Sequence, residues 1–363
     1  MDNKNFYVAI MAGGIGSRFW PQSRVHRPKQ FLDILGTGKT LIQMTYERFA
    51  KIVPEDHIYI ITGEMYVEEM KNQLPTIQDF QIVAEPARRN TGPCVAYIAY
   101  KLAAINPDAT FIVAPSDHLI LEPEAFSTQI NTALQFAAKE DALVTLGIKP
   151  HRPDTGYGYI QYDEDKQEGE LYKVKTFTEK PNLELAETFL KSGDFLWNSG
   201  IFIWNVQRII HSFRTYAAEI SELFEGEGSQ TAYNTEEEKA FVEKVYSLCK
   251  NISIDYAVME HAQNVYVLPS SFGWNDLGTW TSLWENHEKD YFGNAIEGEN
   301  VMVYNTQNCV VTAPKGKMVV VQGLEGYCVV DTEDVLMICR MKDEQKIKQI
   351  NADIKKTKGT QYL

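Results

Sequence analysis

Glycines and basic side chains gather in residues 9–32, which read AIMAGGIGSRFWPQSRVHRPKQFL. A short apolar run at 6–11 overlaps the start of this segment, and its strand-forming residues predict a buried first strand. Glycines after this run let the backbone turn sharply and approach a ligand closely, and successive N–H groups in such a turn bind anions. We therefore expect a polyphosphate-binding site. The residues expected to form it are Ala12, Gly13, Gly14, Gly16, Arg18 and Lys29.

Two other phosphate-binding motifs are incomplete in this region. A dinucleotide-binding G-x-G-x-x-G counted from Gly14 has Phe19 at its third glycine, and a proline-containing loop follows where a helix belongs. The run 36–40, GTGKT, is similar to the end of a Walker A loop, but Asp33 occupies the position of the first glycine. We interpret that run as a tight turn before a helix.

Two aspartates that follow expected strands are candidate metal ligands. Asp117 comes directly after an apolar strand at 110–114, and Asp276 stands in a glycine-bounded loop after a strand at 265–268. Carboxylates at strand ends beside a triphosphate suit Mg²⁺, which prefers hard oxygen ligands and keeps several waters. The alternative for Asp117 is a turn-forming aspartate. We expect Asp117 and Asp276 to hold one Mg²⁺ ion, and we interpret His118 as structural.

The loop 84–92, AEPARRNTG, is the second candidate binding loop. A carboxylate such as Glu85 can accept hydrogen bonds from adjacent N–H donors of a nucleotide base, and guanine offers its N1–H and 2-amino groups in this way. Arg88, Arg89 and Asn90 carry donors that suit phosphate or base oxygens, and the individual roles of the two arginines stay open. The alternative is a capped helix start with solvated arginines.

Residues from 151 onward carry features of a sugar site. Gly158 stands beside an expected strand, so main-chain groups can approach a hydroxyl closely. Glu179 can accept from sugar hydroxyls and Lys180 suits a phosphate, and Pro181 interrupts the strand so that both side chains can reach one place. Asn198 lies in an apolar run and needs a polar partner, for which a sugar is a candidate.

Strands and helices alternate through the first half of the chain. Strands are expected at 57–62, 80–84, 110–114 and 142–146. Helices are expected at 41–53, in a charged segment that ends at 73, at 93–105 with Thr91 as cap, and at 124–139. This order predicts an α/β fold with a doubly wound, mixed but mostly parallel sheet, in which ligands bind beyond the carboxyl ends of the strands. The glycine loop, Glu85 and Asp117 all fall at such ends.

The remaining segments complete the expected domain organisation. We expect a catalytic domain at 1–288, with a sugar-binding half at about 151–288, and a small β-domain with a terminal helix at 289–363. The acidic helical stretch 221–251 is interpreted as a solvated periphery. The roles of Asp255 and Glu260, on an expected short helix, stay open, and a structural role is one alternative.

The bulk composition excludes several classes of function. The 363 residues carry a formal net charge of −14, which argues against binding nucleic acid or anionic membranes. The five cysteines are scattered without a CxxC pair, so we expect neither a disulfide framework nor a zinc site. No apolar segment is long enough to span a bilayer, and a cytoplasmic location is expected.

The combination GGIGSR…WP…PKQF resembles the signature of the sugar-1-phosphate nucleotidylyltransferases, and Trp20–Pro21 and Lys29–Leu32 favour the mannose branch of that family. The similarity recurs in WNSG at 197–200, in DYAVME at 255–260 and in GWNDLGTW at 273–280, and it covers nearly the whole chain. It implies a Rossmann-like nucleotidyltransferase fold. Family members often carry a short left-handed β-helix near the C-terminus, although this sequence shows no clean hexapeptide repeat.

The resemblance also implies a reaction: GMP would pass from GTP to mannose 1-phosphate, giving GDP-mannose and pyrophosphate. Mg²⁺ would be held by Asp117 and Asp276, while Arg18, Lys29 and Lys180 would neutralise phosphate charge. The resemblance also implies that Asn90 and Thr91 contact the nucleotide. A sugar phosphate is already ionised, so positioning and charge neutralisation replace a general base. The family implies a homodimer, for which the sequence itself carries no signal.

Two alternatives stay open at this point. One is a sister enzyme that joins glucose 1-phosphate to UTP or dTTP, since Trp20–Pro21 and Glu85 favour mannose and guanine without deciding the matter. The other is a regulatory homologue that binds a nucleotide sugar without turnover. Such a protein would be expected to lack one of the metal or lysine positions, and all of them are present here. A dehydrogenase is disfavoured because the third glycine is missing.

Overall fold

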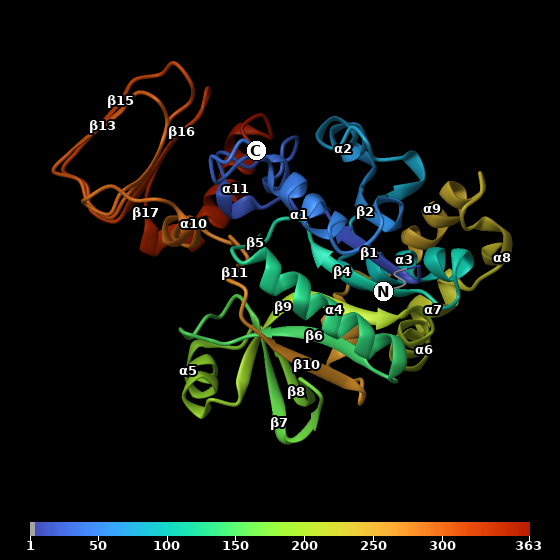
Figure 1. Cartoon of the computed structure of the whole chain (residues 1–363). Coiled ribbons are helices and arrows are strands. Elements are labelled where there is room, and N and C mark those ends of the chain that lie inside the picture. The colour runs from blue at the N-terminus through green and yellow to red at the C-terminus, as the bar shows by residue number, and fades with distance from the viewer. Residues whose placement is uncertain (1–3) are drawn as a thin grey trace. The chain divides into compact units, whose positions relative to one another are not determined.

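A computed structural model describes residues 4–363 (Figure 1). Contacts divide the described chain into two units, and neither is continuous in sequence. Unit 1 comprises the residues up to Gly13 together with 46–116 and 120–274, and unit 2 comprises 14–45, 117–119 and 275–363. Helix α1 (Leu41–Ala50) and the short strands β5 (Leu119–Ile120) and β11 (Trp274–Asn275) lie where the chain passes from one unit to the other. Each unit is described by itself.

Unit 1 is built on a nine-stranded mixed sheet. Its strands, in spatial order, are β3 (Ile82–Glu85), β2 (Ile58–Gly63), β1 (Phe6–Met11), β4 (Thr110–Pro115), β9 (Phe195–Asn205), β6 (Leu143–Ile148), β10 (Val265–Ser270), β8 (Leu171–Glu179) and β7 (Gly158–Glu168). The first four strands pair in parallel, as β10 does with β6, whereas β9, β7 and β8 introduce antiparallel pairs. The expected α/β fold with parallel central strands is confirmed.

Helices cover both faces of this sheet, which is why β1 is apolar throughout. Tyr7 and Ala9 share a core with α3 (Thr91–Ile105) and α6 (Val206–Tyr216). Because side chains alternate along a strand, Val8 and Ile10 point to the opposite face, where both are fully buried. Helix α4 (Pro123–Lys139) packs against β4, β6, β9 and β10 and crosses the front of the sheet (Figure 1). The sheet is therefore doubly wound, as expected.

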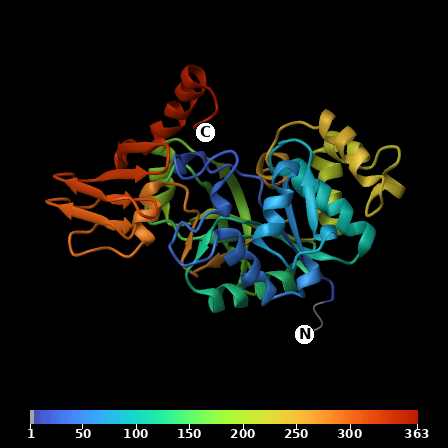
Figure 2. The same cartoon turned by 90° about the horizontal axis from the view of Figure 1, so that it is seen from above.

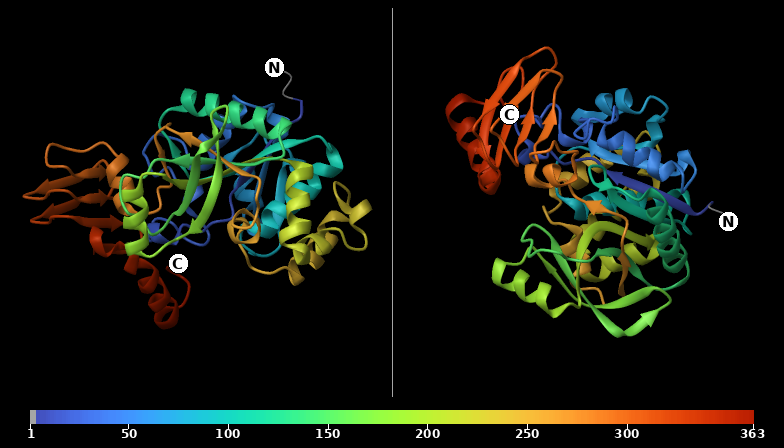
Figure 3. Two further views of the ribbon diagram at one scale, coloured as in Figure 1. Left: turned by 90° about the horizontal axis from the view of Figure 1, so that it is seen from below. Right: turned by 60° about the vertical axis from the view of Figure 1, so that its left-hand side comes forward.

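Shorter helices connect these elements in unit 1. They are η3 (Glu55–His57), η4 (Glu64–Tyr66), α2 (Val67–Gln73), η5 (Asp79–Gln81), α5 (Leu183–Ser192), α7 (Ala218–Phe224), α8 (Ser229–Ala232), α9 (Glu238–Leu248) and η6 (Asp255–Met259). Helix α5 packs its Ala186 and Phe189 against aromatic residues of β7 and β9, and Figure 3 shows this green helix beside the green strands.

Unit 2 ends in a small solenoid of strands. Strands β12 (Ala295–Glu297), β14 (Val310–Thr312) and β16 (Tyr327–Asp331) pair in parallel, as do β13 (Val301–Tyr304) and β15 (Val319–Gln322), and β17 (Leu336–Arg340) closes the first sheet antiparallel to β16. Successive strands thus alternate between two stacked sheets around Cys309, Val311, Val321 and Val329. Figure 2 shows the orange strands running side by side. The expected short β-helix is confirmed.

The glycine-loop segment of unit 2 packs on this β-helix. It contains the turns η1 (Ser17–Phe19) and η2 (Lys29–Phe31), and the C-terminal part adds α10 (Trp280–Asn286), η7 (Met341–Lys346) and α11 (Ile347–Lys358). Phe19 and Trp20 share a buried core with Val330 and Ile347. Arg24, almost fully buried, makes two hydrogen bonds of 2.8 and 2.6 Å to the carboxylate of Asp334. Among residues 4–363, no helix has the length and apolar character needed to cross a membrane.

Candidate active site

The glycine loop is braced by side chains that follow it in sequence. Gly16 has φ of 65°, and a methyl group on it would stand 2.5 Å from Cβ of Lys29. Only glycine combines this left-handed backbone with so close an approach. Gln30 donates from Nε2 to the carbonyl of Gly14 at 3.0 Å, and Ser23 donates to the carbonyl of Ile15 at 2.5 Å. Gly16 and Lys29 are thus packed together.

Lys29 is buried, and its ammonium has three acceptors in unit 2. It lies 2.8 Å from Oδ2 of Asp117 and donates to the carbonyls of Asp276 at 2.8 Å and Leu277 at 3.1 Å. One side chain therefore ties together the two segments that carry the expected metal ligands. We call Gly16, Arg18, Lys29, Asp117 and Asp276 the Lys29 cluster.

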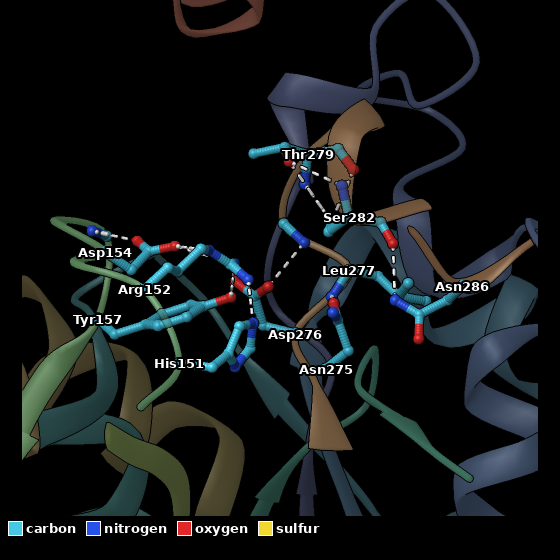
Figure 4. A network of polar contacts seen from close by, with 12 residues as sticks. His151, Arg152, Asp154, Tyr157, Asn275, Asp276, Leu277, Thr279, Ser282 and Asn286 are labelled. Atoms are coloured by element: carbon cyan, nitrogen blue, oxygen red, sulfur yellow. Dashed lines mark hydrogen bonds and ion pairs between the residues drawn. The ribbon is translucent and has the colours of Figure 1, made fainter. Parts of the chain in front are cut away.

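The carboxylates of the Lys29 cluster are held in place by their surroundings. Burial alone would raise the pKa of Asp117, but Lys29 and His118 outweigh it and lower that pKa below its ordinary value, so the group is ionised at neutral pH. Asp276 accepts from the backbone N–H of Gly278 at 2.9 Å, in a tight turn that precedes α10 (Figure 4). Thr279 caps α10 by accepting from the N–H of Ser282, which fixes the end of this turn.

A cavity of about 290 Å³ in unit 2 brings these residues together. Its wall consists of Gly16, Ser17, Arg18, Phe19, Lys29, Asp117, His118, Asp276, Leu277, Gly278 and Lys348. Nε of Arg18 is buried there and has no hydrogen-bond partner among residues 4–363, while Nη1 donates to the carbonyl of Gly278 at 3.5 Å. A donor group that lacks a protein partner is suited to a ligand oxygen.

The donor set in this cavity fits a magnesium ion better than a transition metal. Residues 4–363 contain no group of three or more His, Cys, Asp or Glu side chains arranged to hold a metal. Two carboxylates on one wall suit Mg²⁺, which is held by one or two carboxylates together with substrate phosphates and waters. His118 lies with Nε2 4.0 Å from Oδ1 of Asp117 and lines the same cavity, so it is closer to the candidate site than the sequence indicated.

Glu85 ends β3 in unit 1 and lies beside Gly13. A methyl group on Gly13 would stand 3.5 Å from Oε2 of Glu85, while Oε1 accepts a 2.8 Å hydrogen bond from the hydroxyl of Tyr246. Burial raises the pKa of Glu85 to about 7, and the bond from Tyr246 and the charge of Arg88 limit that rise. Ala12, directly after β1, is buried and its N–H donates to the carbonyl of Ile61.

The other residues of the second loop have contacts within the protein. Asn90, not Thr91, caps α3: it has φ of 67° and its side chain accepts from the N–H of Thr91. The sequence prediction of a Thr91 cap is therefore wrong, because Thr91 already belongs to the helix and its hydroxyl accepts from the N–H of Ile254 at 2.9 Å. Arg88 donates to the hydroxyl of Tyr66, and Arg89 donates to the carbonyl of Tyr246. The nucleotide contacts expected of Asn90 and Thr91 stay predictions.

The residues expected to bind the sugar converge at the ends of β7, β8 and β9. Gly158 pairs with Glu179 across β7 and β8, and a methyl group on Gly158 would collide with Oε2 of Glu179 and stand 3.3 Å from Cβ of Asn198. Lys180 has φ of 47°, which turns the chain out of the strand, and its ammonium forms an ion pair with Glu179. The two charged side chains therefore reach one place, as the interrupting proline indicated.

Asn198 finds its polar partners inside unit 1. Its Nδ2 donates to Oδ1 of Asp255 at 3.0 Å, and its Oδ1 accepts from Thr145 at 3.2 Å and from the N–H of Gly200 at 3.1 Å. Ser199 donates to a backbone carbonyl. The polar groups of this apolar strand thus do not require a sugar to be satisfied.

Asp255 belongs to the same group, although the sequence left its role open. Burial, together with the charge of Glu179, raises the pKa of Asp255 to about 6. A perturbed carboxyl group beside Asn198 and Glu179 is typical of a functional site. We call Gly158, Glu179, Lys180, Asn198 and Asp255 the Glu179 cluster. The only sequence signal for Asp255 was its place in a segment, DYAVME, that resembles the family.

Comparison with known proteins identifies the family of this chain. Residues 7–291 match the family described as nucleotidyl transferase, and residues 298–352 match the MannoseP isomerase/GMP-like beta-helix domain. The alginate biosynthesis protein AlgA of Pseudomonas aeruginosa is 36% identical over 95% of this chain and 71% of its own length. A mannose-1-phosphate guanylyltransferase of Escherichia coli is 34% identical over 94% of this chain and 74% of its own length.

A solved structure from Thermus thermophilus, described as a mannose-1-phosphate geranyltransferase, is 31% identical with a TM-score of 0.83 and covers 97% of this chain and 99% of its own. The fold agrees with these matches. This chain therefore belongs to the nucleotidyl transferase family, among the mannose-1-phosphate guanylyltransferases.

Proposed function

We propose that this protein transfers GMP from GTP to mannose 1-phosphate and releases pyrophosphate and GDP-mannose. The observation that carries the proposal is the Lys29 cluster, in which two cations and two carboxylates line one cavity behind a glycine loop. Relatives at 34% to 36% identity that are named mannose-1-phosphate guanylyltransferase support the choice of substrates.

The reaction brings two polyanions together, so charge is the main obstacle. A phosphate oxygen of mannose 1-phosphate attacks the α-phosphorus of GTP, and the bond to the β-phosphate breaks as pyrophosphate leaves. Arg18 and the glycine-loop amides bind the departing phosphates, and Lys29, fixed by three acceptors, presents a charge to the α-phosphate. Preorganised donors of this kind need no rearrangement during the reaction.

A divalent metal is generally needed by nucleotidyltransferases of this kind. For this chain we propose Mg²⁺, held by Asp117 and Asp276. When bound, the ion supplies neutralisation of phosphate charge. The ionised state of Asp117 supports this assignment, since a protonated carboxyl group would not bind the ion.

The Glu179 cluster is proposed to bind the sugar phosphate. Glu179 accepts from sugar hydroxyls, Lys180 meets the phosphate, and Gly158 leaves room for a hydroxyl next to the backbone. Glu85 is proposed to read the guanine. In terms of domains, residues 1–288 would carry the chemistry and 289–363 would support it; a homodimer and a cytoplasmic location stay predictions.

The test is pyrophosphate release by the purified protein with Mg²⁺, over a grid of four nucleoside triphosphates and the 1-phosphates of mannose, glucose and galactose. Turnover that is fastest with GTP and mannose 1-phosphate supports the proposal. Faster turnover of glucose 1-phosphate with UTP or dTTP would keep the phosphate chemistry and contradict the substrate assignment. Binding of GDP-mannose without turnover in any well would contradict the enzymatic proposal.

A further inference from the structure

The acidic helical stretch 221–251 carries one side chain that reaches the candidate nucleotide site. Tyr246 lies near the end of α9, on the buried face formed with Val242 and Val245 at helical spacing. Its ring packs edge-to-face against Tyr97 of α3 at 6.2 Å and against Phe224 of α7 at 6.3 Å. The composition of this stretch indicated a solvated periphery, but the burial of Tyr246 shows that one face of α9 belongs to the core.

Tyr246 is bonded twice to the loop that follows β3. Its hydroxyl donates to Oε1 of Glu85 at 2.8 Å, and its backbone carbonyl accepts from Nε of Arg89 at 3.0 Å. The chain after α9 continues along the same loop, because the N–H of Gly92 donates to the carbonyl of Ile252 at 2.9 Å. Tyr246 is held in place by the packing of α9, and its hydroxyl group therefore contacts the Glu85 carboxylate from a fixed position.

The two carboxylate oxygens of Glu85 have different neighbours. Oε1 accepts from Tyr246, and Oε2 faces Gly13, the first residue of the glycine loop in unit 1. A carboxylate oxygen has two lone pairs, so Oε1 can accept a second donor while it keeps the phenol. Guanine offers two adjacent donors, N1–H and the 2-amino group, that match two carboxylate oxygens.

We propose that Tyr246 is a positioning residue for base recognition: its hydrogen bond fixes the Glu85 carboxylate so that both oxygens can accept from a guanine. This inference rests on the proposed function, because it takes GTP as the nucleotide. It assigns a role in nucleotide choice to the helical stretch that ends in α9.

The charge of Glu85 supports this arrangement. Burial raises the pKa of Glu85 to about 7, and the Tyr246 hydrogen bond works against that rise. The other groups that face Glu85 are Arg88 in its own loop and Cys94 and Tyr97 on α3. Burial raises the pKa values of Cys94, Tyr97 and Tyr246, so these groups stay neutral between pH 6 and 8. Among these groups, Glu85 is therefore the one whose protonation state changes between pH 6 and 8.

The experiment compares Tyr246→Phe with Tyr97→Phe. The two tyrosines touch each other, both are buried, and each donates to a glutamate, but the hydroxyl of Tyr97 bonds Glu238 at 2.6 Å. KM and kcat are measured for GTP and for ITP, whose base lacks the 2-amino group, with saturating mannose 1-phosphate and Mg²⁺ from pH 6 to 8.5. Melting temperatures show whether each variant is folded.

Tyr246→Phe is expected to raise KM for GTP about tenfold at pH 7, the value of one hydrogen bond to a charged group, with kcat within about twofold. The preference for GTP over ITP falls, and the pH below which KM for GTP rises moves upward from about 7. Tyr97→Phe leaves KM for GTP, the GTP preference and the pH profile as in the wild type.

A second comparison uses Glu85→Gln, which cannot titrate. In that background KM for GTP loses its pH dependence near 7, and adding Tyr246→Phe causes no further pH shift. If the wild type prefers GTP but Tyr246→Phe and Tyr97→Phe behave alike, the role of Tyr246 is overturned while the proposed function stands. If the wild type prefers another nucleotide, the proposed function and the guanine assignment fail together.

Discussion

The ammonium of Lys29 lies 2.8 Å from a carboxylate oxygen of Asp117, inside the wall of the cavity that also holds Asp276 and Arg18. Only 4% of the Lys29 side chain is exposed, so its charge depends on this partner and on two carbonyls for compensation. The pair holds a cation at a fixed point and at the same time keeps a candidate metal ligand ionised. The ion pair between Lys29 and Asp117 therefore both fixes the position of the ammonium group and balances its charge.

Gly16→Ala should remove most of the activity, because the new methyl group would stand 2.5 Å from Cβ of Lys29 and displace that side chain. Gly36→Ala is the matched control: both glycines have φ of 65°, but a methyl group on Gly36 meets nothing within 4 Å. Each variant loses roughly 1 kcal/mol of stability from the left-handed backbone. Thermal melting and steady-state turnover measure the two effects. Equal turnover in both variants would show that the contact with Lys29 is unimportant.

Removing the divalent metal with EDTA should abolish turnover, and adding Mg²⁺ should restore it. Asp117→Asn and Asp276→Asn should each raise the Mg²⁺ concentration for half-maximal rate by at least about tenfold, since a neutral amide is a weaker ligand for a hard cation. Asp56→Asn, at an exposed position in unit 1, serves as the control. An unchanged Mg²⁺ requirement in both cavity variants would contradict the metal assignment.

Asp255 should make the protein less stable as the pH rises from 4 to 7. Its pKa in the folded protein is about 6, above the ordinary 3.8, so the stability that its protonated form contributes is lost as the pH rises through 6. Asp255→Asn removes this titration. The melting temperature of the variant minus that of the wild type should therefore increase between pH 4 and pH 7.

Asp194→Asn should show the opposite sign, because the hydrogen bond from Gln161, with other donors, lowers the pKa of Asp194 below 3.8. Its stabilising contribution is present above pH 4 and is lost below that pH. Melting temperatures of both variants at several pH values provide the check. A difference between wild type and Asp255→Asn that does not change with pH would show that the carboxyl group of Asp255 titrates normally.

The sequence was most informative where chemistry and local structure coincide. The glycine loop, Asp117 and Asp276 follow strands or lie in glycine-bounded turns, and these local patterns were enough to predict that they serve one site. The run GTGKT was also interpreted correctly as a turn: the N–H groups of Thr37 and Gly38 donate to the carboxylate of Asp33.

The contacts that the sequence could not predict join segments far apart in the chain. Tyr246 meets Glu85 across 161 positions, and no periodicity in an acidic helix distinguishes a buried phenol that serves a site from one that serves the core. The role of Asp255 stayed open because Asp255 begins the short helix η6, whereas its partner Asn198 lies on strand β9, 57 positions earlier. The cap of α3 was misplaced by one residue, since Asn90 and Thr91 are both good capping residues and only the backbone angles separate them.

Whether the Lys29 cavity is the catalytic site is tested most directly by single-turnover formation of GDP-mannose from GTP and mannose 1-phosphate by the wild type, Lys29→Ala and Lys39→Ala. Lys39 lies in the exposed GTGKT turn and provides the matched control. The expected rate is lower by roughly 10²–10³ in Lys29→Ala, by analogy with loss of one oxyanion donor, and unchanged in Lys39→Ala. Product formation at the wild-type rate by folded Lys29→Ala would contradict the claim that this cavity is where the chemistry takes place.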